Sequence, residues 1–350
     1  MEVFPGIHRI RVPIPALPSG ERPTGVLSSV NVYLLGGDKG WTLIDTGLNI
    51  PGTYTIMEGE LKSIGIDFSD ISTVVVTHAH LDHIGFMERL KQLSDARLFH
   101  HELEASYTTL TGLRAENILQ TVGKWLQRNG CTKKDSLAPE NLPRGFLKYL
   151  SAAFPDAFNF GCRIPAPDVF ISNGDVIDTG AFKLEALWTP GHSSGHICLH
   201  AAEQRVLFSG DHLLPHITPV VILSPYSRPN PLSDFTDALG RVGKLDVNLT
   251  LPGHGDPIVD LKKRIHELLA HHETRFRAIL DVIGKTPKTA HTIATELVWM
   301  PEQGGVSWQR LDPWSRRLAF METLAHLKVL ESEGRIERSI IADMNQYGIK

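Results

Sequence analysis

The stretch Thr77-His78-Ala79-His80-Leu81-Asp82-His83 contains four potential metal ligands within six consecutive positions, in the pattern His-x-His-x-Asp-His. Imidazole is the commonest side-chain ligand of zinc, and a carboxylate adds the harder oxygen donor found in many catalytic metal sites. Histidine accounts for 17 of the 350 residues. At that frequency the pattern arises by chance in about one such chain in several hundred. The segment therefore predicts a metal site, and its ligand number indicates two ions.

The residues before this stretch place it at the end of a strand. Ile71 to Val76 is rich in β-branched residues, which is typical of a buried strand. Side chains alternate along an extended segment, so His78 and His80 are expected to point the same way. Asp82 and His83 follow closely enough to turn toward a second ion.

Three later segments each place a polar side chain after an apolar, strand-like run and a few small residues. These candidate ligands are His192, Asp211 and His254. Glycine stands beside each of them and allows the backbone to approach an ion without a side-chain clash. We therefore expect these three side chains to complete the site.

In their order and spacing, these blocks and Leu43-Ile44-Asp45-Thr46-Gly47 resemble the signature blocks of the metallo-β-lactamase superfamily. The resemblance covers about three quarters of the chain. It implies two metal ions bridged by Asp211. The ligands that it implies are His78, His80 and His192 for one ion, and Asp82, His83 and His254 for the other.

The resemblance also implies a fold, an α/β protein with the four-layered αββα metallo-β-lactamase architecture. We predict a catalytic domain over residues 1–260 with a helical insertion at about 102–165. Residues 261–350 are expected to form a helical linker and a winged-helix-like domain, because a helical stretch, a turn, an apolar helical face and a short strand follow one another. The predicted strands are Ile7–Pro13, Ser29–Leu35 and Trp41–Asp45; the predicted helices are Gly52–Ile64, Ile84–Leu93, Leu261–Leu280 and Thr289–Val298; and Ile14–Gly25 is expected to be a mobile loop.

The chemistry that such a site supports is hydrolysis. Two divalent ions that share a water lower its pKa to about 7, so that a metal-bridging hydroxide attacks the substrate without a Ser or Cys nucleophile. Asp82 is the best candidate for orienting this water, and Asp211 is the second catalytic residue. Asp45 is expected to brace the metal loop, and His196 and His212 are close enough in sequence to the ligands to orient them or to contact substrate.

Within the superfamily, the diiron flavoproteins typically replace the second histidine by Glu, and the antibiotic-degrading enzymes lack the bridging Asp. The chain follows neither pattern and resembles the branch with two Zn²⁺ ions, although Fe or Mn remains an alternative. That branch includes hydroxyacylglutathione hydrolases, lactonases and RNA-processing nucleases. A small-molecule ester, thioester or lactone is the expected substrate.

Two features bear on the substrate. The acyl-homoserine lactonases carry a Tyr shortly after the bridging Asp, where this chain has Leu213, Leu214 and Pro215, so a lactone is less favoured. The predicted insertion is rich in apolar residues at helical spacing and favours a lid over a substrate with an apolar portion. These residues are Ile118, Val122, Trp125, Leu126, Phe146, Leu147, Leu150, Phe154 and Phe158.

Two other functions stay open. The C-terminal unit resembles that of a lactamase-like subgroup whose animal member is a mitochondrial endoribonuclease, so cleavage of single-stranded RNA is the alternative activity. From Lys285 to Lys350, however, the chain has nine Lys/Arg and eight Asp/Glu residues. This nearly balanced charge is not what is expected of a nucleic-acid-binding domain. This unit is expected to pack, to shape the pocket or to form a homodimer. A non-enzymatic metal-bound sensor is the third reading, and the open, seven-ligand site argues against it.

Composition limits which binding partners and which cellular compartment are expected. The net charge of −4 and the pI near 6.5 give no general attraction to nucleic acid or anionic membranes. Three cysteines without Cys-x-x-Cys spacing predict neither a disulfide framework nor a zinc ribbon. No signal-peptide or membrane-spanning run is visible. We expect a soluble cytoplasmic protein. The paired histidines His100, His101, His271 and His272 are expected to be solvent-facing or locally hydrogen-bonded, with no metal role.

Overall fold

The computed structural model describes residues 1–15, 27–50, 52–104, 115–132, 165–300 and 304–350. The predicted mobile loop lies almost entirely outside these residues. So do Phe146, Leu147, Leu150, Phe154 and Phe158 of the predicted insertion.

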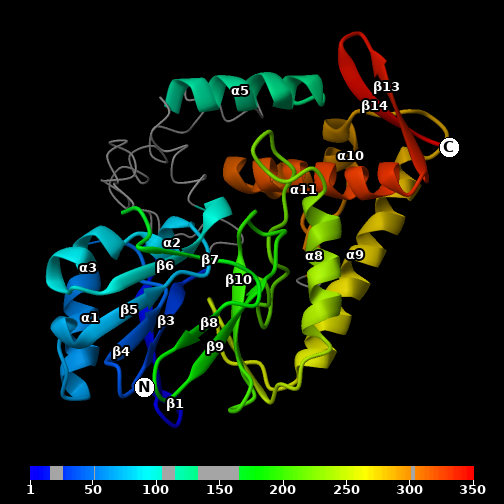
Figure 1. Cartoon of the computed structure of the whole chain (residues 1–350). Coiled ribbons are helices and arrows are strands. Elements are labelled where there is room, and N and C mark those ends of the chain that lie inside the picture. Colours follow the sequence, from blue (N-terminus) through cyan, green and yellow to red (C-terminus); the bar gives the residue numbers. More distant parts are fainter. Residues whose placement is uncertain (16–26, 51, 105–114, 133–164, 301–303) are drawn as a thin grey trace.

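Two β-sheets stand at the centre of the described chain (Figure 1). The first has strands in the order β1 to β7, and the second has the order β12-β11-β10-β9-β8. The strands of the first sheet are β1 (Glu2–Phe4), β2 (Ile7–Pro13), β3 (Ser29–Leu35), β4 (Trp41–Ile44), β5 (Ile71–Val75), β6 (Arg97–His101) and β7 (Val169–Ile171). Those of the second are β8 (Val176–Asp178), β9 (Lys183–Trp188), β10 (Ile197–Ala201), β11 (Val206–Gly210) and β12 (Leu249–Pro252).

Helices cover the outer face of each sheet (Figure 1). On the first sheet lie α1 (Thr53–Ser63) and α3 (Met87–Leu93), with the short helix α2 (Leu81–Ile84) at the sheet edge and the 3-10 turn η1 (Phe68–Asp70) before β5. On the second sheet lie α8 (Pro231–Val242) and α9 (Leu261–Ile283). The buried apolar residues form three clusters that match these layers. One cluster packs the first sheet against its helices, one fills the space between the sheets, and one packs the second sheet against α8, α9 and the C-terminal helices. The predicted αββα layering is therefore present.

The predicted strands Ile7–Pro13 and Ser29–Leu35 are confirmed residue by residue, and Trp41–Asp45 is confirmed except that β4 ends at Ile44. The predicted helix Ile84–Leu93 is wrong as a single element, because two helices, α2 and α3, cover this region. Between them, the amide of Phe86 donates to the carbonyl of Gly47 at 2.9 Å. This bond to a neighbouring loop interrupts the helical hydrogen-bond ladder.

The C-terminal region continues with α10 (Ala290–Glu296), the 3-10 turn η4 (Trp308–Arg310), α11 (Pro313–Ser332) and the hairpin of β13 (Ile336–Ile341) and β14 (Met344–Ile349). The predicted helical face of α11 is buried as expected, with Leu324 at 1% and Leu330 at 0% exposure. This order of helices and hairpin matches the order expected for a winged-helix-like unit, and the assignment to that class stays a prediction. The apolar cluster that contains α11 also contains Leu207 of β11 and Phe235 of α8, so the C-terminal helices share a core with the second sheet.

Most of the described part of the predicted insertion is helix α5 (Ala115–Arg128), which lies across the top of the view in Figure 1. Val122 and Leu126 are buried in the cluster shared with the C-terminal helices. At the end of α5, the side-chain oxygen of Asn129 accepts a hydrogen bond from the side-chain NH2 group of Asn345 at 3.0 Å. The helix is thus attached to the C-terminal hairpin, and its predicted action as a lid stays a prediction.

None of the helices in the described chain combines the length and the apolar character needed to span a membrane.

Candidate metal centre

The seven predicted ligands all lie just beyond the carboxyl ends of strands. The loop after β5 carries His78 and His80, the short helix α2 that follows it carries Asp82 and His83, and the loops after β9, β11 and β12 carry the other three. Strands β4, β5 and β6 are mutually parallel, and β11 is parallel to β12. Strand β9 runs in the same direction, since it is antiparallel to β10, which is antiparallel to β11. All these loops therefore gather at one edge of the two packed sheets.

Hydrogen bonds between the two sheets hold this edge together. The amide of Ile197 donates to the carbonyl of Thr77 at 3.0 Å, and the amide of Asn31 donates to the carbonyl of Gly253 at 2.7 Å. The hydroxyl of Tyr33 donates to the carbonyl of Pro252 at 2.7 Å. Backbone groups beside the ligands are therefore fixed across the sheet interface.

Three histidines form the first group of donors. Nδ1 of His80 lies 3.0 Å from Nε2 of His78 and 3.0 Å from Nε2 of His192. These three residues meet the geometry of a group able to hold a metal ion. It is the same set that the resemblance implied for one ion.

The second group contains Asp82, His83 and His254 and also meets that geometry. Nε2 of His254 lies 3.2 Å from Oδ2 of Asp82 and 3.3 Å from Nε2 of His83. Both histidines are buried, whereas the side chain of Asp82 is 27% exposed. This half of the site therefore reaches solvent through Asp82.

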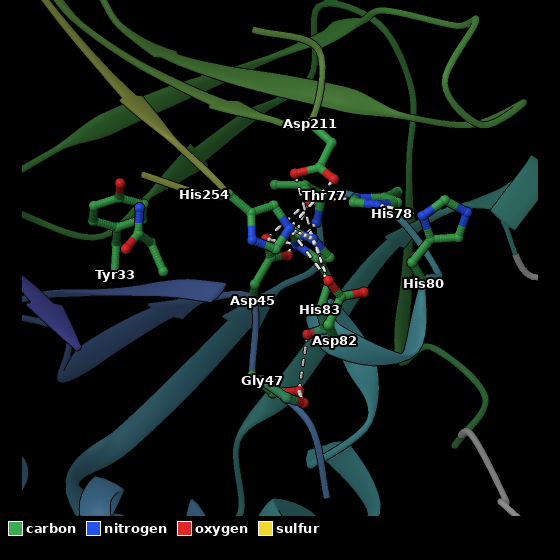
Figure 2. Close-up of polar contacts among 12 residues, drawn as sticks. Tyr33, Asp45, Gly47, Thr77, His78, His80, Asp82, His83, Asp211 and His254 are labelled. Atoms are coloured by element: carbon green, nitrogen blue, oxygen red, sulfur yellow. Dashed lines mark hydrogen bonds and ion pairs between the residues drawn. The ribbon is translucent and has the colours of Figure 1, made fainter. Parts of the chain in front are cut away.

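Asp211 spans the two groups. Its Oδ2 lies 3.5 Å from Nε2 of His192 and 3.5 Å from Nε2 of His254, and its Oδ1 lies 3.5 Å from Nε2 of His83. Figure 2 shows its carboxylate with His254 on one side and His78 and His80 on the other. The structure thus brings all seven side chains together, with Asp211 in the position expected of a bridge.

The hydrogen bonds of the outer ring nitrogens determine which nitrogens can bind an ion. Nδ1 of His192 lies 2.8 Å from the carbonyl of Val220, and Nδ1 of His254 lies 2.7 Å from the carbonyl of Ser29. A carbonyl oxygen only accepts, so each Nδ1 carries the hydrogen, and in the neutral ring Nε2 presents a lone pair to the cluster.

The same reasoning applies to His78 through a relay. The Thr77 hydroxyl lies 2.9 Å from Oδ2 of Asp45, which only accepts, and 3.0 Å from Nδ1 of His78. The hydroxyl donates its one hydrogen to Asp45 and accepts from His78, so Nε2 of His78 also presents a lone pair.

This donor set fits a divalent cation. Nδ1 of His80 lies beside the lone pairs of two histidines, His78 and His192. A hydrogen on Nδ1 of His80 could be donated to only one of them, so hydrogen bonds among the three rings leave one lone pair without a donor. In the same cluster Oδ1 of Asp211 is buried and has no hydrogen-bond partner among the described residues. A Cβ on Gly253 would lie 2.5 Å from that oxygen, so the backbone here packs directly against the donors. Convergent lone pairs and carboxylate oxygens of this kind suit Zn²⁺ or a similar ion.

The charges of the carboxylates act on the second group. Burial lowers the pKa of His254, but Asp211 and Asp82 outweigh burial and raise this pKa to about 10. Burial likewise lowers the pKa of His83, while Asp211, Asp82 and Asp45 raise it well above its ordinary value. In contrast, burial and the charge of His192 lower the pKa of His80 to about 3. The carboxylate-rich half thus attracts positive charge, which a divalent cation supplies while both histidines stay neutral.

Comparison with known proteins agrees with this geometry. Residues 25–254 match the family model described as the metallo-β-lactamase superfamily. The chain belongs to the metallo-β-lactamase superfamily.

Individual superfamily members are similar to most of the chain. The probable metallo-hydrolase YqjP of Bacillus subtilis is 28% identical over 333 residues, which cover 93% of this chain and 92% of that protein. The human acyl-coenzyme A thioesterase MBLAC2 is 27% identical over 239 residues, which cover 64% of this chain and 72% of that protein. A solved structure of a metallo-β-lactamase family protein from Thermus thermophilus is 30% identical, with a TM-score of 0.78 and 100% coverage of both chains.

The three predicted neighbours of the ligands differ in how they contact this superfamily site. Asp45 accepts hydrogen bonds from the Thr77 amide at 2.8 Å and from Nδ1 of His83 at 2.7 Å. His196 accepts from the Asp211 amide at 3.0 Å. His212 is fully buried against Phe235, with ring centroids 4.9 Å apart, and neither of its nitrogens has a hydrogen-bond partner among the described residues.

Three of the paired histidines are buried, and the expectation that each is solvent-facing or locally hydrogen-bonded is wrong for two of them, His100 and His272. His100, His101 and His272 are 1%, 6% and 2% exposed. Nδ1 of His101 accepts a local bond from the Leu103 amide, but Nδ1 of His272 lies 3.1 Å from Nε2 of the distant His326. Each is buried because helices or strands remote in sequence pack over it. Among the residues that the structure describes, none of the four joins a metal-binding group.

Two kinds of contact were missing from the sequence prediction. The carbonyls of Val220 and Ser29 that fix the histidine rings carry no sequence signal, because every residue has a carbonyl. The buried carboxylate of Glu104 lies between two ligand loops. It follows β6 by three residues, and neither that strand nor a role for Glu104 was predicted from the sequence.

Proposed function

We propose that this protein is a binuclear metal-dependent hydrolase, with two Zn²⁺ ions, that cleaves an ester, thioester or lactone of a small molecule, and that a thioester is the favoured substrate. The observation that carries the proposal is the convergence of seven donors into two groups joined by Asp211. Structural zinc sites are usually closed sets of four ligands, whereas this set is larger and partly open.

The proposed ligands are His78, His80 and His192 for one ion and Asp82, His83 and His254 for the other, with Asp211 shared. When bound, two such ions lower the pKa of a water molecule toward neutrality and polarise a carbonyl oxygen.

The protein's own residues orient the reactants. Asp82 is the most exposed of the three carboxylates at the site, with 27% side-chain exposure against 8% for Asp211 and 2% for Asp45. It is therefore the carboxylate best placed to accept a hydrogen bond from the attacking water and to orient its lone pair. Asp45 is committed to Thr77 and His83, so its role is to hold the His83 ring.

A thioester is favoured by the similarity to the human acyl-coenzyme A thioesterase, which covers 64% of this chain. Hydrolysis of a thioester forms a bond between the water oxygen and the carbonyl carbon and breaks the C–S bond, and it releases a carboxylic acid and a thiol. A thiol is a better leaving group than an alcohol, so this reaction needs no strong acid beside the sulfur.

The test has two parts. Metal analysis of the purified full chain should find about two ions per chain. A substrate panel should compare acyl-coenzyme A thioesters, simple esters, lactones, a chromogenic phosphodiester and labelled single-stranded RNA. Turnover of thioesters supports the proposal. Turnover of RNA alone would replace it with the nuclease activity that the sequence left open, and two bound ions with no turnover would favour a sensor.

The matched variants are Asp211→Asn and Asp95→Asn. The first removes a shared negative charge from the centre and should lower kcat/KM by at least about 100-fold. The second makes the same chemical change at an exposed position on the loop before β6 and should leave kcat/KM unchanged. Equal activity in both variants would contradict the assigned role of Asp211.

A further inference from the structure

Glu104 is a buried carboxylate that connects two ligand-bearing loops. It is 1% exposed and follows β6 by three residues. Its Oε2 accepts a hydrogen bond from the amide of Ala79 at 2.8 Å, and its Oε1 accepts from the amide of Gly195 at 2.6 Å. Ala79 stands between His78 and His80, and Gly195 follows His192 by three residues. One side chain thus fixes the backbone on both sides of the first donor group.

The backbone of Gly195 packs closely against Glu104. A Cβ on Gly195 would lie 2.8 Å from the amide nitrogen of Glu104 and 2.9 Å from its Cγ. The segment that carries Glu104 is itself anchored, because the ring of His101 stacks on Trp188 with centroids 5.9 Å apart and planes inclined by 12°. Strand β9, which ends at Trp188, leads into the His192 loop.

A second buried carboxylate, Asp45, serves the other half of the centre. It holds the ring of His83, which belongs to the second donor group, together with the amide of Thr77. Among the described residues, Glu104 makes no hydrogen bond or ion pair with that group, and both its oxygens accept from amides beside ligands of the first group. Glu104 therefore holds two backbone amides of the loops that carry the first group, whereas Asp45 contacts the ring of His83 directly and reaches His78 only through the Thr77 hydroxyl.

We infer that Glu104 is a positioning residue that sets the metal affinity of the group formed by His78, His80 and His192. It holds the two loops at the separation at which their imidazole nitrogens converge. Loss of such an outer contact typically weakens metal binding by about 10- to 100-fold. This inference rests on the metal ligands of the proposed function and is independent of the substrate.

The experiment compares Glu104→Gln with Glu102→Gln in the full chain. The Gln at position 104 keeps the size of the side chain, but its NH2 group faces one of the two amides and cannot accept. Glu102 is exposed and lies two residues away, so its variant matches the charge change without a contact to either loop.

Each variant is made in two backgrounds that retain one donor group. His254→Ala disrupts the second group, and His192→Ala disrupts the first. Zn²⁺ affinity is measured by competition with a chromogenic chelator, and thermal unfolding of the metal-free protein is recorded in parallel. We expect Glu104→Gln to weaken Zn²⁺ by about 10- to 100-fold in the His254→Ala background and to leave the His192→Ala background unchanged.

A parallel measurement avoids dependence on the single-site proteins. In the otherwise wild-type chain, Zn²⁺ is removed stepwise. For Glu104→Gln, one ion should be bound more weakly than in wild type and the other with unchanged affinity. For Glu102→Gln, both ions should be bound with unchanged affinity. Equal weakening of both ions, or a lower unfolding temperature with unchanged affinities, would show that Glu104 only stabilises the fold and would overturn the inference. A wild-type chain that binds no Zn²⁺ would instead refute the proposed function itself.

Discussion

Oδ2 of Asp45 lies 2.7 Å from Nδ1 of His83, and both side chains are almost fully shielded from solvent, at 2% and 0% exposure. Asp45 directly follows β4 and has a φ of 60°, a left-handed conformation that is uncommon outside glycine. That conformation allows a residue at a strand end to turn its carboxylate toward the neighbouring ligand loop. The contact fixes the hydrogen of His83 on Nδ1 and leaves Nε2 for the cluster.

Asp45→Asn should weaken metal binding at the second donor group by about 10- to 100-fold while the fold stays intact. An Asn side chain can donate its NH2 group to Nδ1 of His83, which moves the ring hydrogen to Nε2 and removes the ligating lone pair. Chelator competition measures the affinity, and circular dichroism checks the fold. Asp38→Asn is the control, because Asp38 is exposed at the turn before β4. Unchanged Zn²⁺ affinity in Asp45→Asn would show that the contact does not set the tautomer.

Gly191→Ala should reduce both activity and metal content. Gly191 precedes His192, has a φ of 136°, and a Cβ there would lie 2.4 Å from Cβ of Phe235. Either the loop or α8 must then move, and His192 moves with the loop. The control is Gly174→Ala, since Gly174 also has a positive φ, of 88°, but open space around its Cβ position.

In the control we expect a loss of about 1–2 kcal/mol of stability from backbone strain, with normal metal content. Urea unfolding and metal analysis measure the two quantities for both variants. Normal metal content and activity in Gly191→Ala would show that the loop relaxes without moving its ligand.

The metal-free protein should lose stability as the pH falls below about 6.5 because of His272 and His326. Burial lowers the pKa of His326 to about 3, and burial with the charge of His326 lowers the pKa of His272 well below its ordinary value. The unfolded chain therefore binds more protons than the folded one, so stability is full above the ordinary pKa and declines as the pH falls toward the folded value. Arg275 and His271 add positive charge beside the pair in the same direction.

At about pH 5.5, each histidine that stays neutral in the folded protein lowers the free energy of unfolding by about 1.4 kcal/mol relative to its value at neutral pH. Urea unfolding at a series of pH values measures this slope. His272→Gln should reduce the slope, whereas His266→Gln, at an exposed position of the same helix, should leave it unchanged. An equal slope in wild type and His272→Gln would contradict the assignment.

Removal of metal should abolish hydrolysis and lower the unfolding temperature. An ion that binds only the folded chain adds about 2.7 kcal/mol of stability at a free concentration 100 times its Kd. Dialysis against a chelator, followed by readdition of Zn²⁺, should remove and restore both properties, as measured by calorimetry and by turnover of a thioester. Full activity after complete removal of metal would refute the proposed mechanism.

The sequence by itself determined the kinds of ligand and their places at strand ends. The β-branched run before His78 forms β5 as predicted, apart from its last residue, and His192, Asp211 and His254 come after the ends of β9, β11 and β12. These features depend on local preference and alternation, which neighbouring residues carry. The net charge and the ligand pattern were likewise visible without a fold.

Only the tertiary structure decided how the ligands are held. The carbonyls of Val220 and Ser29 fix the rings of His192 and His254 across 28 and 225 residues of chain, respectively. Glu104 reaches Gly195 across 91 residues. Contacts over such separations arise from sheet packing, so no local pattern predicts them. The burial of His272 and the break between α2 and α3 have the same origin, because packing against remote segments outweighed local preference there.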